Sequence, residues 1–269
     1  MRPQPRVLLL TADSRRHRFV AQRLAGALNL VGIVSQNKRG AVDERTVQEE
    51  ADREVIDKHL RERAEVERRL LGECDFPAVD RFELLQDDIN GPRAVNWIEQ
   101  KAPHFIVLYG TGILRPPLLS MYEGRMVNMH LGLSPYYRGA GTNFWPLVDG
   151  VPACVGCTIH LAVQKVDAGA VLAQVRPVPE ADDRAHELGI KAIVAGVGAL
   201  AVSLGRYAQG SLQPAGQDLS IGKVYRRSDF HADAVRRMWS NLDSGMLSRY
   251  LANRAADDAR WPIRDEGFA

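Results

Sequence analysis

The sequence predicts an α/β protein with a predominantly parallel central sheet and helices on both faces. A short apolar run, Val7–Leu10, precedes a segment with apolar residues at helical spacing, Arg15–Leu28, and a second apolar run, Leu30–Val34, follows. This order of strand, helix and strand is typical of a parallel sheet, because parallel strands need a crossover connection. Further apolar runs of strand length recur along the chain and extend the pattern.

Composition limits the classes of protein that remain. The 269 residues are 45% hydrophobic and 25% charged, as in ordinary globular proteins, and 35 basic against 33 acidic residues leave a net charge of +2. That balance favours neither a nucleic acid nor a membrane as a partner. The apolar runs are shorter than the ~20 residues of a membrane span, and the first is too short for a signal peptide. We therefore expect a cytoplasmic protein; self-association into a homo-oligomer stays open.

The first half of the chain continues with a charged segment and a third strand. Lys38–Arg69 mixes both signs of charge, and a thin apolar stripe predicts a long helix there: Val55, Leu60, Val66, Leu70 and Leu71. We favour a solvated helix laid on the domain over a partner-binding arm. Asn90 and Gly91 mark a turn before a short helix, Ala94–Gln100, and Phe105–Tyr109 reads as a buried strand.

The second half supplies the remaining strands and a helical end. Strands are expected at Met126–Met129, Gly156–Val163 and Val171–Val175, with a loop at Gly132–Asn143 and a turn at Lys165–Gly169. Ala185–Tyr207 predicts a long apolar helix whose glycines indicate close packing, and one final helix is expected over about 232–252. These elements predict a catalytic domain over 1–215, with the charged helical insertion at 38–72, and a helical C-terminal extension over 216–269.

Three cysteines, Cys74, Cys154 and Cys157, are too few and odd in number for a disulfide framework, and they fit a reducing compartment. Cys154 and Cys157 form a C-x-x-C pair. Zinc would need a second ligand pair, and a redox pair would open a helix, whereas this pair leads into a predicted strand. We interpret both cysteines as packing residues.

Asn128 and His130 are candidates for chemistry. They are two residues apart, so on a strand they face the same side, where the strand gives way to a glycine-rich loop. Ligands in parallel sheets bind beyond the carboxyl ends of strands. A histidine there can transfer protons, and an asparagine can donate to a developing oxyanion. A structural histidine fits the spacing equally well.

Asp167 lies in the turn Lys165–Gly169, where an aspartate usually caps its own backbone. If it approached His130, its charge would favour the imidazolium and raise the pKa of His130.

Three ordered blocks resemble the folate-dependent formyltransferases. Residues 128–139 (NMHLGLSPYYRG) resemble the signature of this family, and 156–160 (GCTIH) and 166–169 (VDAG) resemble two later segments. Residues 109–114 (YGTGIL) resemble the loop that precedes the signature. The family includes glycinamide ribonucleotide formyltransferase, the catalytic domain of methionyl-tRNA formyltransferase, and sugar-nucleotide N-formyltransferases. The sequence departs from the motif at Gly132 and Ser134, where the family often has serine and leucine.

The resemblance implies a Rossmann-like formyltransferase fold and 10-formyltetrahydrofolate as the formyl donor, with no metal required. Asn128, His130 and Asp167 would be the catalytic trio. The donor would be held by Tyr109, Gly110, Gly112, Ile113, Leu114, Val163 and Val166. The acceptor would lie near the first loop, at Ser14, Arg15 and Arg18, and at Arg138 of the signature.

The acceptor is expected to be a small anionic amine, such as an amino sugar nucleotide or a phosphorylated amine. Arginines in the first turn of a helix oppose the helix dipole, and such a conflict is often functional. The alternative is a solvated basic turn offset by acids of the 38–69 helix. Methionyl-tRNA formyltransferases add a sizeable C-terminal domain, whereas about fifty residues follow Gly216 here. A formyltetrahydrofolate hydrolase, a methionyl-tRNA formyltransferase-like enzyme and a non-catalytic folate-binding module remain alternatives.

Overall fold

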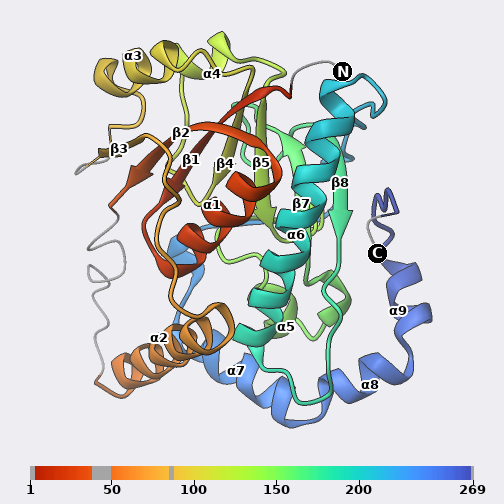
Figure 1. Ribbon diagram of the computed structural model, residues 1–269. Coiled ribbons are helices and arrows are strands. Elements are labelled where there is room, and N and C mark those ends of the chain that lie inside the picture. Colours follow the sequence, from red (N-terminus) through yellow and green to blue (C-terminus); the bar gives the residue numbers. More distant parts are fainter. Residues whose placement is uncertain (1–3, 38–49, 85–87, 268–269) are drawn as a thin grey trace.

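The computed structural model describes residues 4–37, 50–84 and 88–267. Its centre is a seven-stranded sheet in the order β3-β2-β1-β4-β5-β7-β8 (Figure 1). The parallel strands are β1 (Arg6–Ala12), β2 (Asn29–Gln36), β3 (Arg81–Leu84), β4 (Phe105–Tyr109) and β5 (Met126–Leu131). The antiparallel strands are β7 (Cys157–Leu161) and β8 (Val171–Val175). This order confirms the predominantly parallel sheet. The sequence did not predict β3, because charged residues alternate with apolar ones in this short strand.

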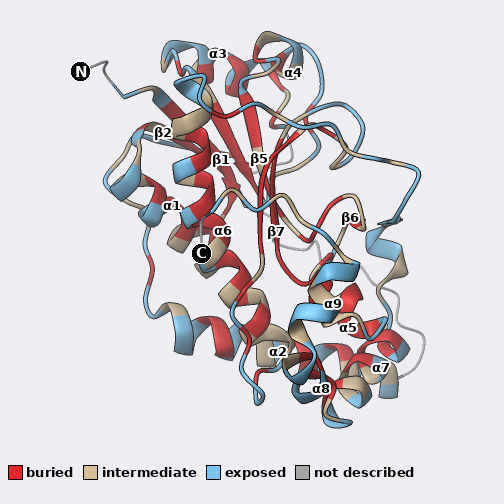
Figure 2. Cartoon of the chain, turned by 90° about the vertical axis from the view of Figure 1, so that its right-hand side faces the viewer, coloured by how far each residue is buried: buried red, intermediate tan, exposed pale blue. Residues whose placement is uncertain are grey.

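Helices cover both faces of the sheet, as the sequence predicts. Alternate residues of β1 show why: Val7 and Leu9 belong to a core with α1 (Arg15–Ala27) and α6 (Ala185–Ala208). Leu8 and Leu10 belong to a second core with α3 (Pro92–Gln100) and α4 (Leu118–Met121). Figure 2 shows the buried strands between these two layers. Each apolar run of the sequence is buried on both sides, which is typical of parallel strands.

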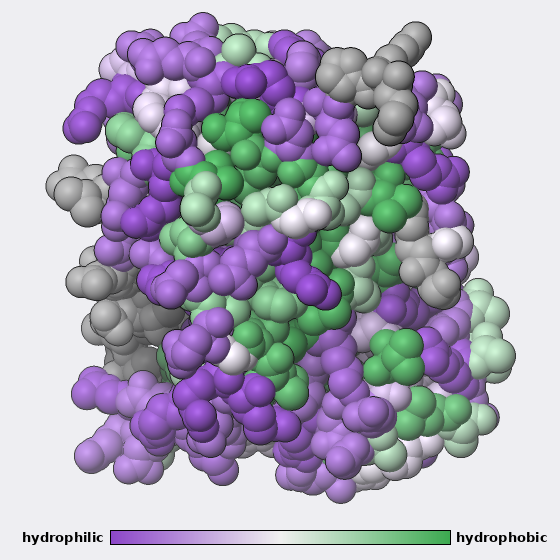
Figure 3. Space-filling model, in the orientation of Figure 1, coloured by the Kyte–Doolittle hydropathy of each residue, from purple (hydrophilic) through white to green (hydrophobic). Residues whose placement is uncertain are grey.

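Helix α6 is long and apolar enough to cross a membrane by length and composition, and more than half of its most apolar window is buried. It packs on β5, β7 and β8. A Cβ atom added at Gly196 would lie 2.6 Å from Sγ of Cys157, so the glycine permits close approach of helix and strand. Figure 3 shows hydrophobic residues across the middle of the face that Figure 1 presents. Two valines of α6, Val194 and Val202, are exposed. Packing on the sheet accounts for the apolar composition.

A third core lies at the lower end of the view in Figure 1. It is formed around α5 (Trp145–Val148), α7 (Ala232–Asp243) and α8 (Met246–Ala252), with α9 (Arg254–Arg260) and the 3₁₀ turns η1 (Pro152–Cys154) and η2 (Arg227–Asp229) beside them. The charged helix α2 (Glu50–Leu71) packs against α1, α6 and α7. It therefore lies on the domain, as expected; residues 38–49 of the predicted insertion lie outside the described residues.

The C-terminal region differs from prediction in two respects. The single helix expected over 232–252 is wrong: α7 ends before Ser244 and Gly245, because Gly245 takes a left-handed φ of +80°. The loop expected at Gly132–Asn143 contains a short strand, β6 (Tyr137–Gly139), which pairs in parallel with β9 (Lys223–Tyr225). Residues on both sides of the predicted boundary at 215 share the third core, and the boundary stays a prediction.

The cysteines are free, and all three are buried. Cys154 lies in η1 and Cys157 in β7, which confirms their interpretation as packing residues. Burial raises the pKa of the Cys154 thiol to about 12, so it stays protonated at neutral pH.

Two glycines of α6 provide a matched test of the packing. Gly198→Ala adds a methyl group with no atom within 4 Å, whereas Gly196→Ala places one against Cys157. Helix propensity changes equally in both. We expect Gly196→Ala to be less stable than Gly198→Ala by about 1–3 kcal/mol, the usual cost of overpacking. Urea unfolding measures the difference, and equal stabilities would contradict the close contact.

Candidate active site

Asn128 and His130 lie at the end of β5, on the face opposite Val127 and Met129, which point into the core beneath α1 and α6. The turn between β7 and β8 brings Asp167 to the same place. Nδ2 of Asn128 donates to Oδ1 of Asp167 at 3.2 Å, and Nδ1 of His130 lies 3.3 Å from Oδ2. The structure therefore brings the three predicted catalytic residues together.

His160 is a fourth member of this cluster. The antiparallel register sets Asn128 directly opposite His160, and Nδ2 of Asn128 lies 3.1 Å from Nε2 of the imidazole. Nδ1 of His160 lies 2.9 Å from the carbonyl oxygen of Leu161, so a proton on Nδ1 leaves Nε2 to accept from Asn128. Nε2 is also 3.4 Å from Asp167. The second sequence block contains His160, but only the strand register reveals its position.

The carboxylate of Asp167 is mostly buried and surrounded by donors. Burial alone would raise its pKa, but the contacts with His130 and with the N–H of Gly139 lower the pKa below its ordinary value. The Gly139 N–H donates to Oδ2 at 2.8 Å. Asp167 itself has a left-handed φ of +47°, which asparagine and aspartate tolerate better than most residues. The group is therefore a fixed negative charge at neutral pH.

Gly139 must be glycine for this contact to form. Its φ is +93°, and an added Cβ atom would lie 2.1 Å from the carbonyl oxygen of Tyr225. The pairing of β6 with β9 thus holds residues 137–139 against the C-terminal region, and in this position the N–H of Gly139 donates to Asp167.

His130 is held between two oxygen acceptors. Nε2 is 3.0 Å from the carbonyl oxygen of Tyr137, and Nδ1 faces Asp167. Burial lowers the pKa of His130, although Asp167 and the Tyr137 carbonyl act in the opposite direction. The expectation that Asp167 raises the pKa of His130 is thus confirmed for the direction of its effect, but desolvation of the buried ring is larger and lowers the net pKa. Protonation would nevertheless give both N–H groups an acceptor.

A polar network fixes the loop after His130. Oγ1 of Thr158 donates to the carbonyl of Gly132 at 2.7 Å and accepts from the N–H of Ser134 at 3.0 Å. Nε2 of Gln174 donates to the Ser134 carbonyl at 2.6 Å. The C-terminal region contributes Gln217, whose amide donates to the backbone carbonyls of Asp167 and Gly169.

The predicted donor-site residues divide into two groups. Ile113, Val163 and Val166 are exposed apolar side chains, with Ile113 66% exposed, so they are available to an apolar ligand. The side chains of Tyr109 and Leu114 are buried in the cores, so only their backbones are available to a ligand, and their part in the donor site stays a prediction.

The glycines of this loop have different roles. Gly110 has a left-handed φ of +64°, and an added Cβ atom would lie 2.3 Å from Nε2 of His17. The Gly112 N–H donates to Oε1 of Gln36 at 2.7 Å. Asn90 holds the next residues, donating to the carbonyl of Ile113 and accepting from the N–H of Arg115.

The predicted acceptor residues of the first loop are engaged within the chain. Arg15 lies 3.2 Å from Glu73, and Arg18 donates to Asp13 at 2.7 Å. Ser14 is the N-cap of α1, and its Oγ is 2.6 Å from Nδ1 of His17. Acids outside the 38–69 helix therefore offset Arg15 and Arg18, whereas Arg16 pairs with Glu67 of that helix. The assignment of Arg15 and Arg18 to the acceptor stays a prediction.

Arg138 is different. It is 5% exposed, and its Nε and one terminal nitrogen have no hydrogen-bond partner in the described parts of the chain. Its two neighbours both contact the catalytic cluster, Tyr137 through its carbonyl and Gly139 through its N–H. A buried guanidinium without an acceptor is costly, so this residue is suited to receive an anion.

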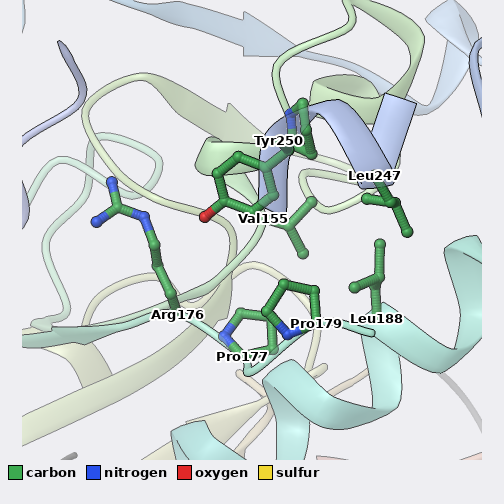
Figure 4. Close-up of a pocket in the computed structure, with 8 residues that line it drawn as sticks. Val155, Arg176, Pro177, Pro179, Leu188, Leu247 and Tyr250 are labelled. Carbon is green, nitrogen blue, oxygen red and sulfur yellow. The ribbon is translucent and has the colours of Figure 1, made fainter. Parts of the chain in front are cut away.

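Two other cavities lie elsewhere. The first, drawn in Figure 4, is lined by Arg176, Tyr250 and apolar residues, and at about 10 Å³ it is no larger than one water molecule requires. Arg176 is already paired with Asp258 at 3.4 Å. The second, about 380 Å³, is lined mainly by α8 and α9. Neither includes a residue of the predicted trio, so we assign neither to the reaction.

Comparison with known proteins adds the family. A family model described as formyl transferase matches residues 17–197. A methionyl-tRNA formyltransferase of Chlorobium chlorochromatii is 29% identical over 135 residues, which are 50% of this chain and 43% of that protein. The match spans less than half the length of that relative.

Solved structures show the same fold. The phosphoribosylglycinamide formyltransferase of Anaplasma phagocytophilum superposes with a TM-score of 0.55 at 18% identity, covering 84% of this chain and 100% of the other. A sugar N-formyltransferase from Shewanella sp. gives a TM-score of 0.53 at 16% identity, covering 84% and 78%. At these identities the likeness concerns the fold.

The protonation of His130 can be measured directly. A pH titration of the histidine resonances by NMR, with His130→Gln as the assignment control, should give His130 a midpoint below 6.5. Because the folded pKa is lowered, the neutral ring contributes stability above pH 6.5 that is lost as the pH falls. A midpoint above 6.5 would show that Asp167 outweighs burial.

Proposed function

Because the chain belongs to the formyl transferase family, we propose that it transfers a formyl group from 10-formyltetrahydrofolate to the amine of a small anionic acceptor. The observation that carries the proposal is the contact of Asn128, His130 and Asp167 at one end of β5. The sequence resemblance names these residues, and the fold brings them within hydrogen-bonding range. We place the reaction in the cytoplasm and its machinery within residues 1–215.

His130 acts as the proton acceptor in this scheme. The acceptor amine attacks the formyl carbon and must lose a proton. Neutral His130 takes that proton after its unprotonated ring nitrogen turns toward the amine from its oxygen neighbour, which is Asp167 or the Tyr137 carbonyl. The proton then passes to the nitrogen of the folate that leaves. A positioned acid–base group of this kind contributes about 10²–10⁴ in rate.

Asn128 stabilises the formyl oxygen as it gains negative charge. Both N–H groups of its amide are engaged here, one by His160 and one by Asp167. One of them turns to the oxyanion during the reaction, and the other keeps the amide oriented. Loss of such a donor typically costs about 10²–10³ in rate.

The donor site is supported by exposed apolar groups beside the cluster. Val163 and Val166 flank the turn that carries Asp167, and Ile113 lies in the loop after β4, next to β5 in the sheet. Apolar side chains exposed together near polar catalytic groups suit the flat ring of a folate.

Arg138 supports an anionic acceptor. It offers free guanidinium donors within one residue of the catalytic contacts, and arginine matches phosphate and carboxylate groups geometrically. A small molecule is favoured over RNA because arginines of the C-terminal extension are paired with acids. Examples are Arg236 with Asp52 at 2.7 Å and Arg260 with Asp257 at 3.1 Å. The methionyl-tRNA formyltransferase relative keeps the RNA acceptor as the second candidate.

The function can be tested without knowing the acceptor. The protein is incubated with 10-formyltetrahydrofolate, with and without a pool of cellular amines, and tetrahydrofolate release is followed. Mass spectrometry then searches for products heavier by one formyl group. Release that requires the pool and yields a formylated small amine supports the proposal. Release without amines identifies a hydrolase, a formylated tRNA identifies the second candidate, and folate binding without release identifies a binding module.

If Ile113 contacts the folate donor, truncating its exposed side chain should lower the affinity of the protein for folate. Ile113→Ala should weaken tetrahydrofolate binding about tenfold, because up to three buried carbons cease to contact the ligand. Val178→Ala, a truncation of a residue that is 72% exposed outside the proposed donor site, is the matched control. Calorimetry measures both, and equal affinities in the two variants would remove Ile113 from the site.

Replacing Arg138 should impair acceptor binding without lowering the stability of the protein. Arg138→Met replaces an unpaired buried charge with an apolar chain, so the free energy of unfolding should stay equal or rise. The KM for the acceptor should rise at least tenfold, with donor affinity unchanged, whereas Arg15→Ala should leave that KM unaltered. A destabilised Arg138→Met protein with normal acceptor kinetics would show a purely structural arginine.

A further inference from the structure

Three side chains that metals favour meet where α2 packs against the beginning of α6, outside the active site. His59 and Glu62 lie one turn apart on α2, and His186 is the second residue of α6. One ligand atom from each residue lies within 4.8 Å of the others. The two imidazole rings are 4.4 Å apart between centroids.

Each histidine has a ring nitrogen that is buried without a partner. Nδ1 of His59 and Nε2 of His186 have no hydrogen-bond partner among the described residues, and His59 is only 6% exposed. Buried polar atoms are nearly always paired, so two unpaired nitrogens facing one carboxylate indicate a missing ligand. The rings of Phe144 and Phe230 lie 5.7 and 5.8 Å from His59, and the ion would therefore be partly shielded from water.

The His186 ring lies beside the backbone of His59. Nε2 is a buried nitrogen of this ring without a hydrogen-bond partner, so its lone pair can take an ion. Histidines that bind metals usually donate their other N–H to a nearby acceptor.

The charged side chains near this cluster include one that would repel a cation and two carboxylates that would attract it. Burial and the nearby charge of Arg63 both lower the pKa of His59 and that of His186. Arg63 would also repel a cation, but Glu67 lies 3.9 Å from it. Glu62 supplies a carboxylate whose described partner is Lys58, 3.9 Å away.

We propose that Nδ1 of His59, a carboxylate oxygen of Glu62 and Nε2 of His186 bind one Zn²⁺ ion, with water as the fourth ligand. Zinc accepts imidazole and carboxylate ligands in tetrahedral sites. The ion ties α2 to the beginning of α6; the two helices pack against each other, and this end of α6 lies in the lower half of the view in Figure 1. Its role is structural, and formyl transfer does not involve it.

The test uses the full chain, freed of metal by a chelator and dialysed. Zn²⁺ is titrated by calorimetry, bound zinc is counted by elemental analysis after gel filtration, and Tm is measured with and without Zn²⁺. We expect one zinc per chain and a raised Tm, with Mg²⁺ producing neither effect. His186→Gln and Glu62→Gln should each weaken zinc binding more than about tenfold, while His104→Gln, on the surface, should leave it unchanged.

Two results would overturn the site: no stoichiometric zinc uptake by the parent protein, or equal uptake by the parent and the His186→Gln and Glu62→Gln variants. Glu62 is half-exposed, so its variant keeps the comparison valid if a histidine variant fails to fold. Zinc held at the catalytic cluster would persist in these variants, and the second result detects it.

Discussion

A buried carboxylate organises the cluster of side chains that we propose to be catalytic. Asp167 accepts hydrogen bonds from the amide of Asn128 and the backbone of Gly139, and it contacts both His130 and His160. A charge in such a place is tolerated only when its acceptor oxygens are matched by donors. Three features of the backbone bring hydrogen-bond donors and ring nitrogens to this carboxylate. The left-handed conformation of Asp167, the glycine at 139 and the opposition of Asn128 to His160 in the β5–β7 register all aim groups at one carboxylate.

The C-terminal region helps to hold that geometry. β9 pairs with β6 and sets the backbone whose N–H reaches Asp167, and Gln217 binds the carbonyls of the turn that carries it. Residues beyond 215 therefore contact the backbone on which the proposed site is built. Arg138 stands apart as a buried cation with two unpaired nitrogens, between two residues that contact the proposed cluster. Folding alone does not account for such a residue, whereas an anionic acceptor would satisfy it.

Local patterns in the sequence correctly predicted the features that depend on residues close together in the chain, such as strand bounds and the face of a strand. The runs at Phe105–Tyr109 and Val171–Val175 are strands with those bounds, and the spacing of Asn128 and His130 placed them correctly on one face. Features that depend on distant pairing were missed. His160 gains its role from strand register, and β6 and β9 are too short to recognise apart. The first-loop arginines meet acids such as Glu67 and Glu73, which are more than fifty residues away.

The protonation state of His130 also could not be predicted from the neighbouring sequence. Proximity of a carboxylate correctly gives the direction in which Asp167 acts on His130, but the extent of burial decides the sum. The same holds for His59 and His186, whose sequence positions on a charged segment and an apolar helix give no sign that they meet.

The central claim is that the ionised Asp167 makes the cluster catalytic. The most direct measurement is the rate of formyl transfer from 10-formyltetrahydrofolate in Asp167→Asn, with Asp57→Asn on the exposed face of α2 as the control. The account predicts a folded protein that binds tetrahydrofolate as the parent does and turns over at least about 10²-fold more slowly. A folded Asp167→Asn protein with a rate close to that of the control would contradict it.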